Sequence, residues 1–198
     1  MIVCDSGRFA VLMNPKTGTT ALSAALAPWA SLTVQHTPGE KHMGYATFLS
    51  RYGSRTQGYA VYCAVRPPLD TLWSWYRYRG RAELADPIHP RHANYTGGIS
   101  FEQFLAEWES DRPPSRSDVG SGSDFVLDES GSVAPMRIFR YSSLDAMAAA
   151  LSGRLGQRLE LPRLNISPGR TMPAPPVSVT GARLRRACDL YQSIGFVA

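Results

Sequence analysis

The residues best suited to chemistry lie in one short run, Asn14-Pro15-Lys16-Thr17-Gly18-Thr19-Thr20. An apolar run from Phe9 to Met13 precedes it and an Ala- and Leu-rich run from Ala21 to Ala27 follows, so it should be a loop between a strand and a helix. Unpaired backbone N–H groups and the positive end of the helix dipole favour an anion of phosphate size at such a helix start. Gly18 allows close backbone approach, and Lys16 adds a mobile positive charge. The run therefore predicts a phosphate-binding loop.

The threonine hydroxyls of this loop, on Thr17, Thr19 and Thr20, add further hydrogen-bond donors. The spacing is not that of the Walker A loop, in which the lysine follows the second glycine, because Lys16 here precedes the glycine, Gly18. A Gly- and Thr-rich surface turn with a solvated lysine, which binds no phosphate, could have the same sequence. A second motif is needed to distinguish the two interpretations.

Arg66 and Ser74, eight positions apart, form that second motif. The near-continuous apolar run 59–65 is typical of a strand buried on both faces, and the two prolines after Arg66 favour the start of a helix over 69–79. The arginine would then lie at a strand end and the serine on the polar face of the helix. A guanidinium can bind a phosphate through two hydrogen bonds and a hydroxyl can donate to the same group, so a second phosphate site is predicted.

Together the two motifs resemble those of sulfotransferases that use 3′-phosphoadenylyl sulfate (PAPS). The segment Pro15 to Thr20 is similar to the loop that holds the 5′-phosphosulfate in that family. Arg66 and Ser74 are similar to its 3′-phosphate motif, usually Val-Arg-(Asn/Asp)-Pro followed by Ser-x-Tyr. Pro67 stands where the family usually has Asn or Asp, so a hydrogen bond from that side chain is missing here.

Three further segments resemble glycan-type and bacterial members of the family. They are Lys41-His42 with Ala46, Phe139 to Leu144, and Leu161 to Arg170. The resemblance implies a fold like that of P-loop nucleoside triphosphate hydrolases and a reaction without a metal ion. It also implies sulfuryl transfer from PAPS, as cosubstrate, to an acceptor hydroxyl, which we expect to belong to a saccharide.

The residue roles follow from the same resemblance. Lys16 would stabilise charge on the transferred sulfonate, the loop from Thr17 to Thr20 would hold the 5′-phosphate, and Arg66 and Ser74 would hold the 3′-phosphate. A histidine suits removal of the acceptor's proton, because its pKa lies near neutrality, and His42 is the first choice. Glu40 and His36 are the alternative bases, Arg170 is a further candidate for the 3′-phosphate, and Trp29 is one candidate to stack on adenine.

Length and composition predict one soluble domain spanning 1–198. The chain is 43% hydrophobic and 19% charged, as globular proteins are, and no apolar run is long enough to span a bilayer. Without a secretory signal we expect a cytoplasmic protein with no membrane partner. Its three cysteines are odd in number and widely spaced, which argues against a disulfide framework and against a zinc site. The net charge of +5 comes almost wholly from arginine, and no nucleic-acid-binding motif accompanies it, so we expect no nucleic-acid partner.

Strands and helices alternate in the remaining pattern. We expect strands at 2–4, 9–13, 32–35, 59–65, 125–127 and 136–141, and helices at 21–27, 44–52, 69–79, 101–108, 144–155 and 180–192. Ser100 should cap the helix that starts at 101, the helix 144–155 should end near Gly156, and Thr180 should cap the last helix. The Ser-, Gly- and Pro-rich stretch 110–123 should be a mobile surface loop. This order predicts a three-layer α/β fold, with a central, mainly parallel sheet flanked by helices and ligands at the carboxyl ends of its strands.

Two other functions stay open. A P-loop kinase or related phosphotransferase would prefer ATP and require Mg²⁺, and a non-catalytic module would bind a nucleotide or an acidic glycan without turnover. The basic, aromatic-flanked region from Arg77 to Arg91 would suit an acidic sugar chain or would be a solvated helix face. The sequence does not indicate an oligomeric state.

Overall fold

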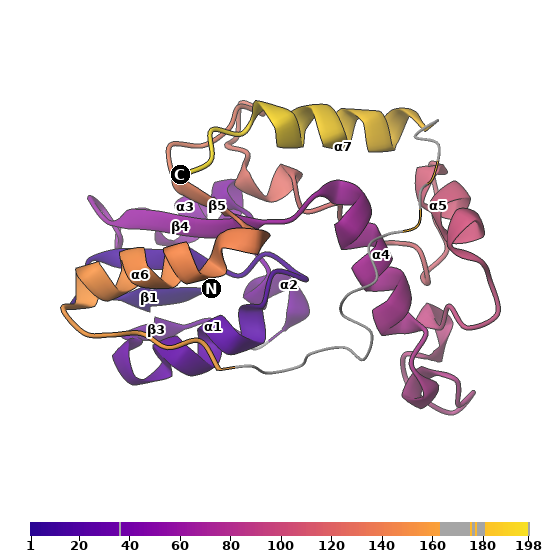
Figure 1. Ribbon diagram of the computed structural model, residues 1–198, viewed down its shortest axis with the longest axis horizontal. Helices are drawn as coiled ribbons and strands as arrows, with labels where there is room; N and C mark the ends of the chain where they lie inside the picture. Colours follow the sequence, from indigo (N-terminus) through magenta and orange to yellow (C-terminus); the bar gives the residue numbers. More distant parts are fainter. Residues whose placement is uncertain (36, 163–174, 176, 178–180, 198) are drawn as a thin grey trace. The chain divides into compact units, whose positions relative to one another are not determined.

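The structure is a computed structural model that describes residues 1–35, 37–162, 175, 177 and 181–197 (Figure 1). Contacts divide the chain into two compact units. Unit 1 comprises Met1–Arg66, Asp124–Pro168 and Ile194–Ala198, and unit 2 comprises Pro67–Ser123 and Gly169–Ser193. That the whole chain folds as a single domain stays a prediction.

Unit 1 contains an open five-stranded sheet with the strand order β3-β1-β2-β4-β5. On one side, β1 (Ile2–Cys4) pairs antiparallel with both β2 (Phe9–Leu12) and β3 (Leu32–Thr33). On the other side, β4 (Ala60–Val65) pairs in parallel with β2 and with β5 (Arg137–Arg140). The fold is therefore α/β with a mixed sheet.

The expectation of a mainly parallel sheet is wrong for the β1 side. Only a short turn links β1 to β2, and in it the Arg8 amide donates to the Asp5 carbonyl over 3.1 Å. A connection this short can join only antiparallel neighbours, because parallel strands need a crossover of a dozen or more residues. The parallel part is confined to the three strands that helical connections separate, β2, β4 and β5.

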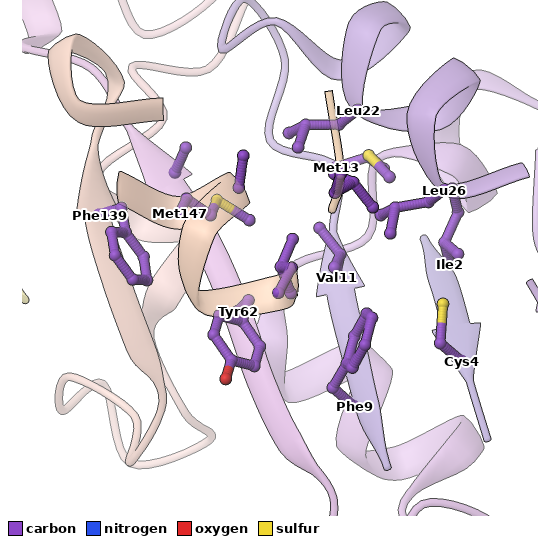
Figure 2. Packing of buried hydrophobic residues seen from close by; sticks show 14 residues of the cluster. Ile2, Cys4, Phe9, Val11, Met13, Leu22, Leu26, Tyr62, Phe139 and Met147 are labelled. Carbon is purple, nitrogen blue, oxygen red and sulfur yellow. The ribbon is translucent and has the colours of Figure 1, made fainter. Parts of the chain in front are cut away.

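Helices α1 (Thr19–Leu26) and α6 (Leu144–Leu155) pack on one face of this sheet. Figure 2 shows the contact, in which two leucines of α1 and a methionine of α6 meet side chains from four strands. The members labelled there are Ile2, Cys4, Phe9, Val11, Met13, Leu22, Leu26, Tyr62, Phe139 and Met147. The strand residues that point to the opposite face, such as Val3, Ala10 and Cys63, are also fully buried. Both faces of the sheet are therefore covered, as the apolar run at β4 predicted.

Unit 1 also contains two helices between β3 and β4, α2 (Pro38–Lys41) and α3 (Tyr45–Tyr52). Helix α6 ends at Leu155, and the next residue, Gly156, is its C-cap in a left-handed conformation with φ 64°. Along β5, the Val197 amide donates to the Ile138 carbonyl over 2.8 Å, so residues 194–197 cover part of the outer edge of that strand.

The strand expected at 125–127 is wrong. Residues Asp124–Val126 form a 3₁₀ helix, η4, and Leu127 makes only an isolated bridge to Val133. The Asp128 carboxylate accepts hydrogen bonds from the amides of Ser130 and Ser132, which closes a tight turn directly after Leu127. Three apolar residues before such a turn cannot show which periodicity they follow.

The described part of unit 2 contains the α-helices α4 (Pro68–Arg79), α5 (Phe101–Glu109) and α7 (Ala182–Ser193). Their core includes Leu72 of α4, Phe104 and Trp108 of α5, and Leu184 of α7. Helix α4 begins at the second proline after Arg66, one residue before the predicted start at 69. As predicted, Ser100 caps α5 by accepting from the Gln103 amide over 3.2 Å. Thr180, the cap expected for the last helix, lies outside the described residues.

The stretch 110–123 is tied to the helices of unit 2 at several points. The Trp108 indole donates to the Val119 carbonyl over 2.8 Å, and the Arg79 guanidinium donates to the Ser115 carbonyl over 2.6 Å. Arg116 forms an ion pair with Glu107.

Within the part of the chain that the structure describes, no helix has the length and apolar character that crossing a bilayer requires.

Candidate functional site

The predicted phosphate-binding loop follows β2 and leads directly into α1. Lys16 has φ 66° and Gly18 has φ 74°, whereas Thr17 between them lies outside the left-handed region. Such alternation turns successive backbone N–H groups toward one side and makes anion-binding concavities. A left-handed conformation costs a lysine about 1–2 kcal/mol, so the surrounding structure must hold it there.

Gly18 is the N-cap of α1, and no side chain caps this helix end. The Leu22 amide, which donates to the Gly18 carbonyl over 3.1 Å, makes the first intrahelical bond. The backbone N–H groups of Thr19, Thr20 and Ala21 precede that bond, so they are the donors that an anion at this end would meet.

Asn14 and Thr17 fix the shape of the loop from inside. Thr17 is 1% exposed and its hydroxyl donates to the Asn14 carbonyl over 2.7 Å, so that hydroxyl stabilises the loop in this conformation. The backbone N–H of Thr17 stays a predicted phosphate ligand. The buried Asn14 side chain donates to the Ala64 carbonyl over 3.1 Å, which ties the loop to β4. We had not singled out Asn14 from the sequence, although it opens the motif.

Arg66 directly follows β4, at the same edge of the sheet as the loop. The carbon at the centre of its guanidinium lies 4.9 Å from the centroid of the Tyr141 ring. The same ring borders the loop, because a Cβ added to Gly18 would lie 3.7 Å from Tyr141 Cε2 and 2.9 Å from Leu144 Cδ1. The resemblance of Phe139 to Leu144 to the sulfotransferase family predicts no role for this tyrosine.

His42 follows α2 and reaches the last residue before the loop motif. Its Nδ1 lies 2.5 Å from the Met13 carbonyl oxygen. A carbonyl oxygen can only accept, so Nδ1 carries the hydrogen, and in the neutral ring Nε2 keeps the lone pair. Burial lowers the pKa of His42 below its ordinary value; the hydrogen bond to Met13 opposes this shift and the positive charge of Lys41 adds to it. A lowered pKa favours the neutral ring at pH 7, in which the lone pair of Nε2 could take a proton.

The alternative bases have different surroundings. Glu40 lies in α2, where its carboxylate accepts from the Thr37 hydroxyl over 3.2 Å and its amide donates to that hydroxyl oxygen. His36 lies outside the described residues, as does Arg170. Trp29, the candidate for adenine, ends the 3₁₀ helix η1 (Ala27–Trp29) and is 36% exposed.

Ser74 is half-buried in α4 and belongs to unit 2. Its role as a ligand of the 3′-phosphate stays a prediction. The structure brings together the other predicted groups of unit 1, since the loop with Lys16, His42 and Arg66 all adjoin the carboxyl ends of β2 and β4.

Among the described residues, no group of three or more His, Cys, Asp or Glu side chains could hold a metal ion. Comparisons of the chain with protein-family models, curated proteins and solved structures each found no match. The function must therefore be inferred from the residues and geometry of this sheet edge.

Proposed function

We propose that the protein is a sulfotransferase that moves the sulfuryl group of PAPS to an acceptor hydroxyl, most simply that of a saccharide. The observation that carries the proposal is the position of Arg66. It follows the strand next to the one that ends in the phosphate-binding loop, and Asn14 links the two strand ends over 3.1 Å. On this proposal, the same edge of the sheet binds two separate anions, one at the loop and one at Arg66.

PAPS carries two separate anionic groups, the 5′-phosphosulfate and the 3′-phosphate. The loop and the start of α1 suit the first, and the guanidinium of Arg66 suits the second. ATP has no 3′-phosphate and would leave Arg66 without this ligand. We include in the proposal the detailed fold that the sequence predicts, three layers arranged as in P-loop nucleoside triphosphate hydrolases.

The reaction would be an in-line displacement at sulfur. The acceptor oxygen forms a bond to sulfur while the bond from sulfur to the bridging oxygen of the 5′-phosphate breaks, releasing adenosine 3′,5′-bisphosphate. The proton of the acceptor hydroxyl passes to Nε2 of His42. Lys16 and the N–H groups at the start of α1 stabilise the charge on the bridging and peripheral oxygens, so the protein acts by positioning and electrostatics.

The saccharide part of the proposal draws on α4 of unit 2. Three arginines of this region pack on aromatic rings, in the pairs Arg77 on Trp73, Arg79 on Trp75 and Arg81 on Tyr78. Aromatic faces and guanidinium groups side by side are suited to an acidic sugar. The guanidinium of Arg79 has fewer N–H groups left for a sugar, because it donates hydrogen bonds to the carbonyls of Ser115 and Asp118.

Thermal unfolding with different nucleotides tests the proposal. A ligand at about one hundred times its Kd adds about 2.7 kcal/mol to the free energy of unfolding, which for a chain of this size raises Tm by about 5–10 °C. Adenosine 3′,5′-bisphosphate without metal should stabilise more than ADP or ATP, with or without Mg²⁺. Arg66→Ala should abolish the difference. The matched control is Arg158→Ala, because the side chain of Arg158 is 87% exposed and its ion pair is with the exposed Glu160.

Each alternative function has its own outcome. Stabilisation by ATP with Mg²⁺ above the bisphosphate would indicate a phosphotransferase and refute the proposal. Tight binding of the bisphosphate without transfer of labelled sulfate from PAPS to any of a panel of saccharides, lipids and small hydroxyl compounds would indicate a binding module.

A further inference from the structure

We infer that Tyr141 is a positioning residue whose ring holds the Arg66 guanidinium in the orientation that binds the 3′-phosphate. This inference rests on the proposed function. The guanidinium carbon lies 4.9 Å from the ring centroid, within the range in which an aromatic face attracts a cation. A guanidinium packed on a ring keeps its N–H donors in its own plane, where they can meet a phosphate.

The register of the sheet explains why these two side chains meet. Val65 of β4 pairs in parallel with Arg140 of β5, so the next residues, Arg66 and Tyr141, leave the sheet from neighbouring positions. Arg66 is followed by Pro67, whose ring clashes with a helical backbone at the residue before it and so favours an extended conformation for Arg66. The backbone of Arg66 therefore has little freedom to carry its side chain away from the ring.

Tyr141 has a rigid support. It begins the 3₁₀ helix η5 (Tyr141–Ser143), which continues directly into α6. Two residues of α6, Met147 and Leu151, are fully buried in the core against the sheet. Because Tyr141 lies at the start of η5 and α6, its ring keeps its position, and the longer side chain of Arg66 adjusts to the ring.

The same ring also borders the phosphate-binding loop, because its Cε2 atom lies 3.7 Å from the position of a Cβ on Gly18. One side chain thus adjoins both predicted anion sites. The two phosphates of PAPS have a separation limited by the ribose between them. A ring between the sites fixes the distance of the guanidinium from the loop and matches it to such a ligand.

The test uses two ligands that differ only in the 3′-phosphate, adenosine 3′,5′-bisphosphate and adenosine 5′-phosphate. Isothermal titration of each gives a ratio of Kd values that isolates the contribution of the 3′-phosphate. Tyr141→Leu should reduce this ratio about tenfold, equivalent to about 1.4 kcal/mol. Any change that the variant causes in the loop affects both ligands and therefore cancels in the ratio. Tyr141→Phe keeps the ring face and should keep the ratio. With Arg66→Ala already present, Tyr141→Leu should reduce the ratio no further.

The outcomes separate this inference from the proposed function. A wild-type chain that does not prefer the bisphosphate overturns both. A wild-type preference that survives Tyr141→Leu overturns only the positioning role. So does a loss in Tyr141→Phe as large as in Tyr141→Leu, because the hydroxyl would then be responsible, or an undiminished effect of Tyr141→Leu in the Arg66→Ala chain. Tyr141→Met, which also lacks a ring, replaces Tyr141→Leu if that variant does not fold.

Discussion

Replacement of Gly18 by alanine should destabilise the protein through two separable effects. Gly18 has φ 74°, a conformation that alanine adopts only at a cost of about 1–2 kcal/mol. The new methyl group would also lie 2.9 Å from Leu144 Cδ1, closer than real contacts of this kind. The atom that it meets is the end of the half-buried Leu144 side chain, which can turn to relieve the contact at the cost of a strained rotamer, about 0.5–1.5 kcal/mol.

Two other glycines of unit 1 make matched controls for these effects. Gly156 has φ 64° but open space around its Cβ position, so Gly156→Ala should show the backbone cost of about 1–2 kcal/mol alone. Gly153 lies inside α6 without a positive φ and with open space around it. Gly153→Ala should therefore raise the free energy of unfolding by about 0.5–1 kcal/mol, because alanine loses less backbone entropy in a helix.

Urea denaturation followed by circular dichroism measures all three changes. We expect the free energy of unfolding of Gly153→Ala to exceed that of wild type, that of Gly156→Ala to fall below it, and that of Gly18→Ala to be lowest, about 1.5–3.5 kcal/mol below wild type. Gly18→Ala should also weaken binding of adenosine 3′,5′-bisphosphate, because the loop changes shape, whereas Gly156→Ala should not. Equal stabilities of Gly18→Ala and Gly156→Ala would refute the contact with Leu144, and wild-type stability of Gly18→Ala would refute the loop conformation itself.

Three further predictions concern single side chains. Burial lowers the pKa of His42, so below about pH 6.5 the folded state binds fewer protons than the unfolded state, and the free energy of unfolding should fall as the pH drops. Urea denaturation midpoints of His42→Gln that keep the wild-type dependence on pH would contradict this. Lys16→Ala should lower kcat for sulfuryl transfer by roughly two orders of magnitude or more, and a loss of only a few-fold in steady-state assays would exclude a charge contact in the transition state. Cys4 and Cys63 are buried, and burial raises the pKa of Cys4 to about 11 and that of Cys63 further. A thiol reagent should therefore label the partly exposed Cys188 first. Early labelling of Cys4 would show that the β1 region opens.

Elements that depend on neighbouring residues could be predicted from the sequence. The prolines after Arg66, the serine at position 100 and the glycine at 156 act within one turn of the helix ends that they define, and all three predictions are confirmed. The mixed sheet could not be predicted in the same way. Strand direction depends on which strands become neighbours, and only the short link from Asp5 to Arg8 carried that information.

Some residues of the candidate site could be predicted from the sequence and others could not. Lys16, Arg66 and His42 could be selected because each residue type has its own chemistry and lies in a recognisable local pattern. Asn14 and Tyr141 have no such chemistry, and their proposed importance arises from the partners that the sheet brings to them, the Ala64 carbonyl and the Arg66 guanidinium. Both partners lie at the end of β4, and both contacts require the parallel register of β4 with its two neighbours. Residues that position others are therefore found only after strand order and register are known, whereas residues that could bind or react are visible before.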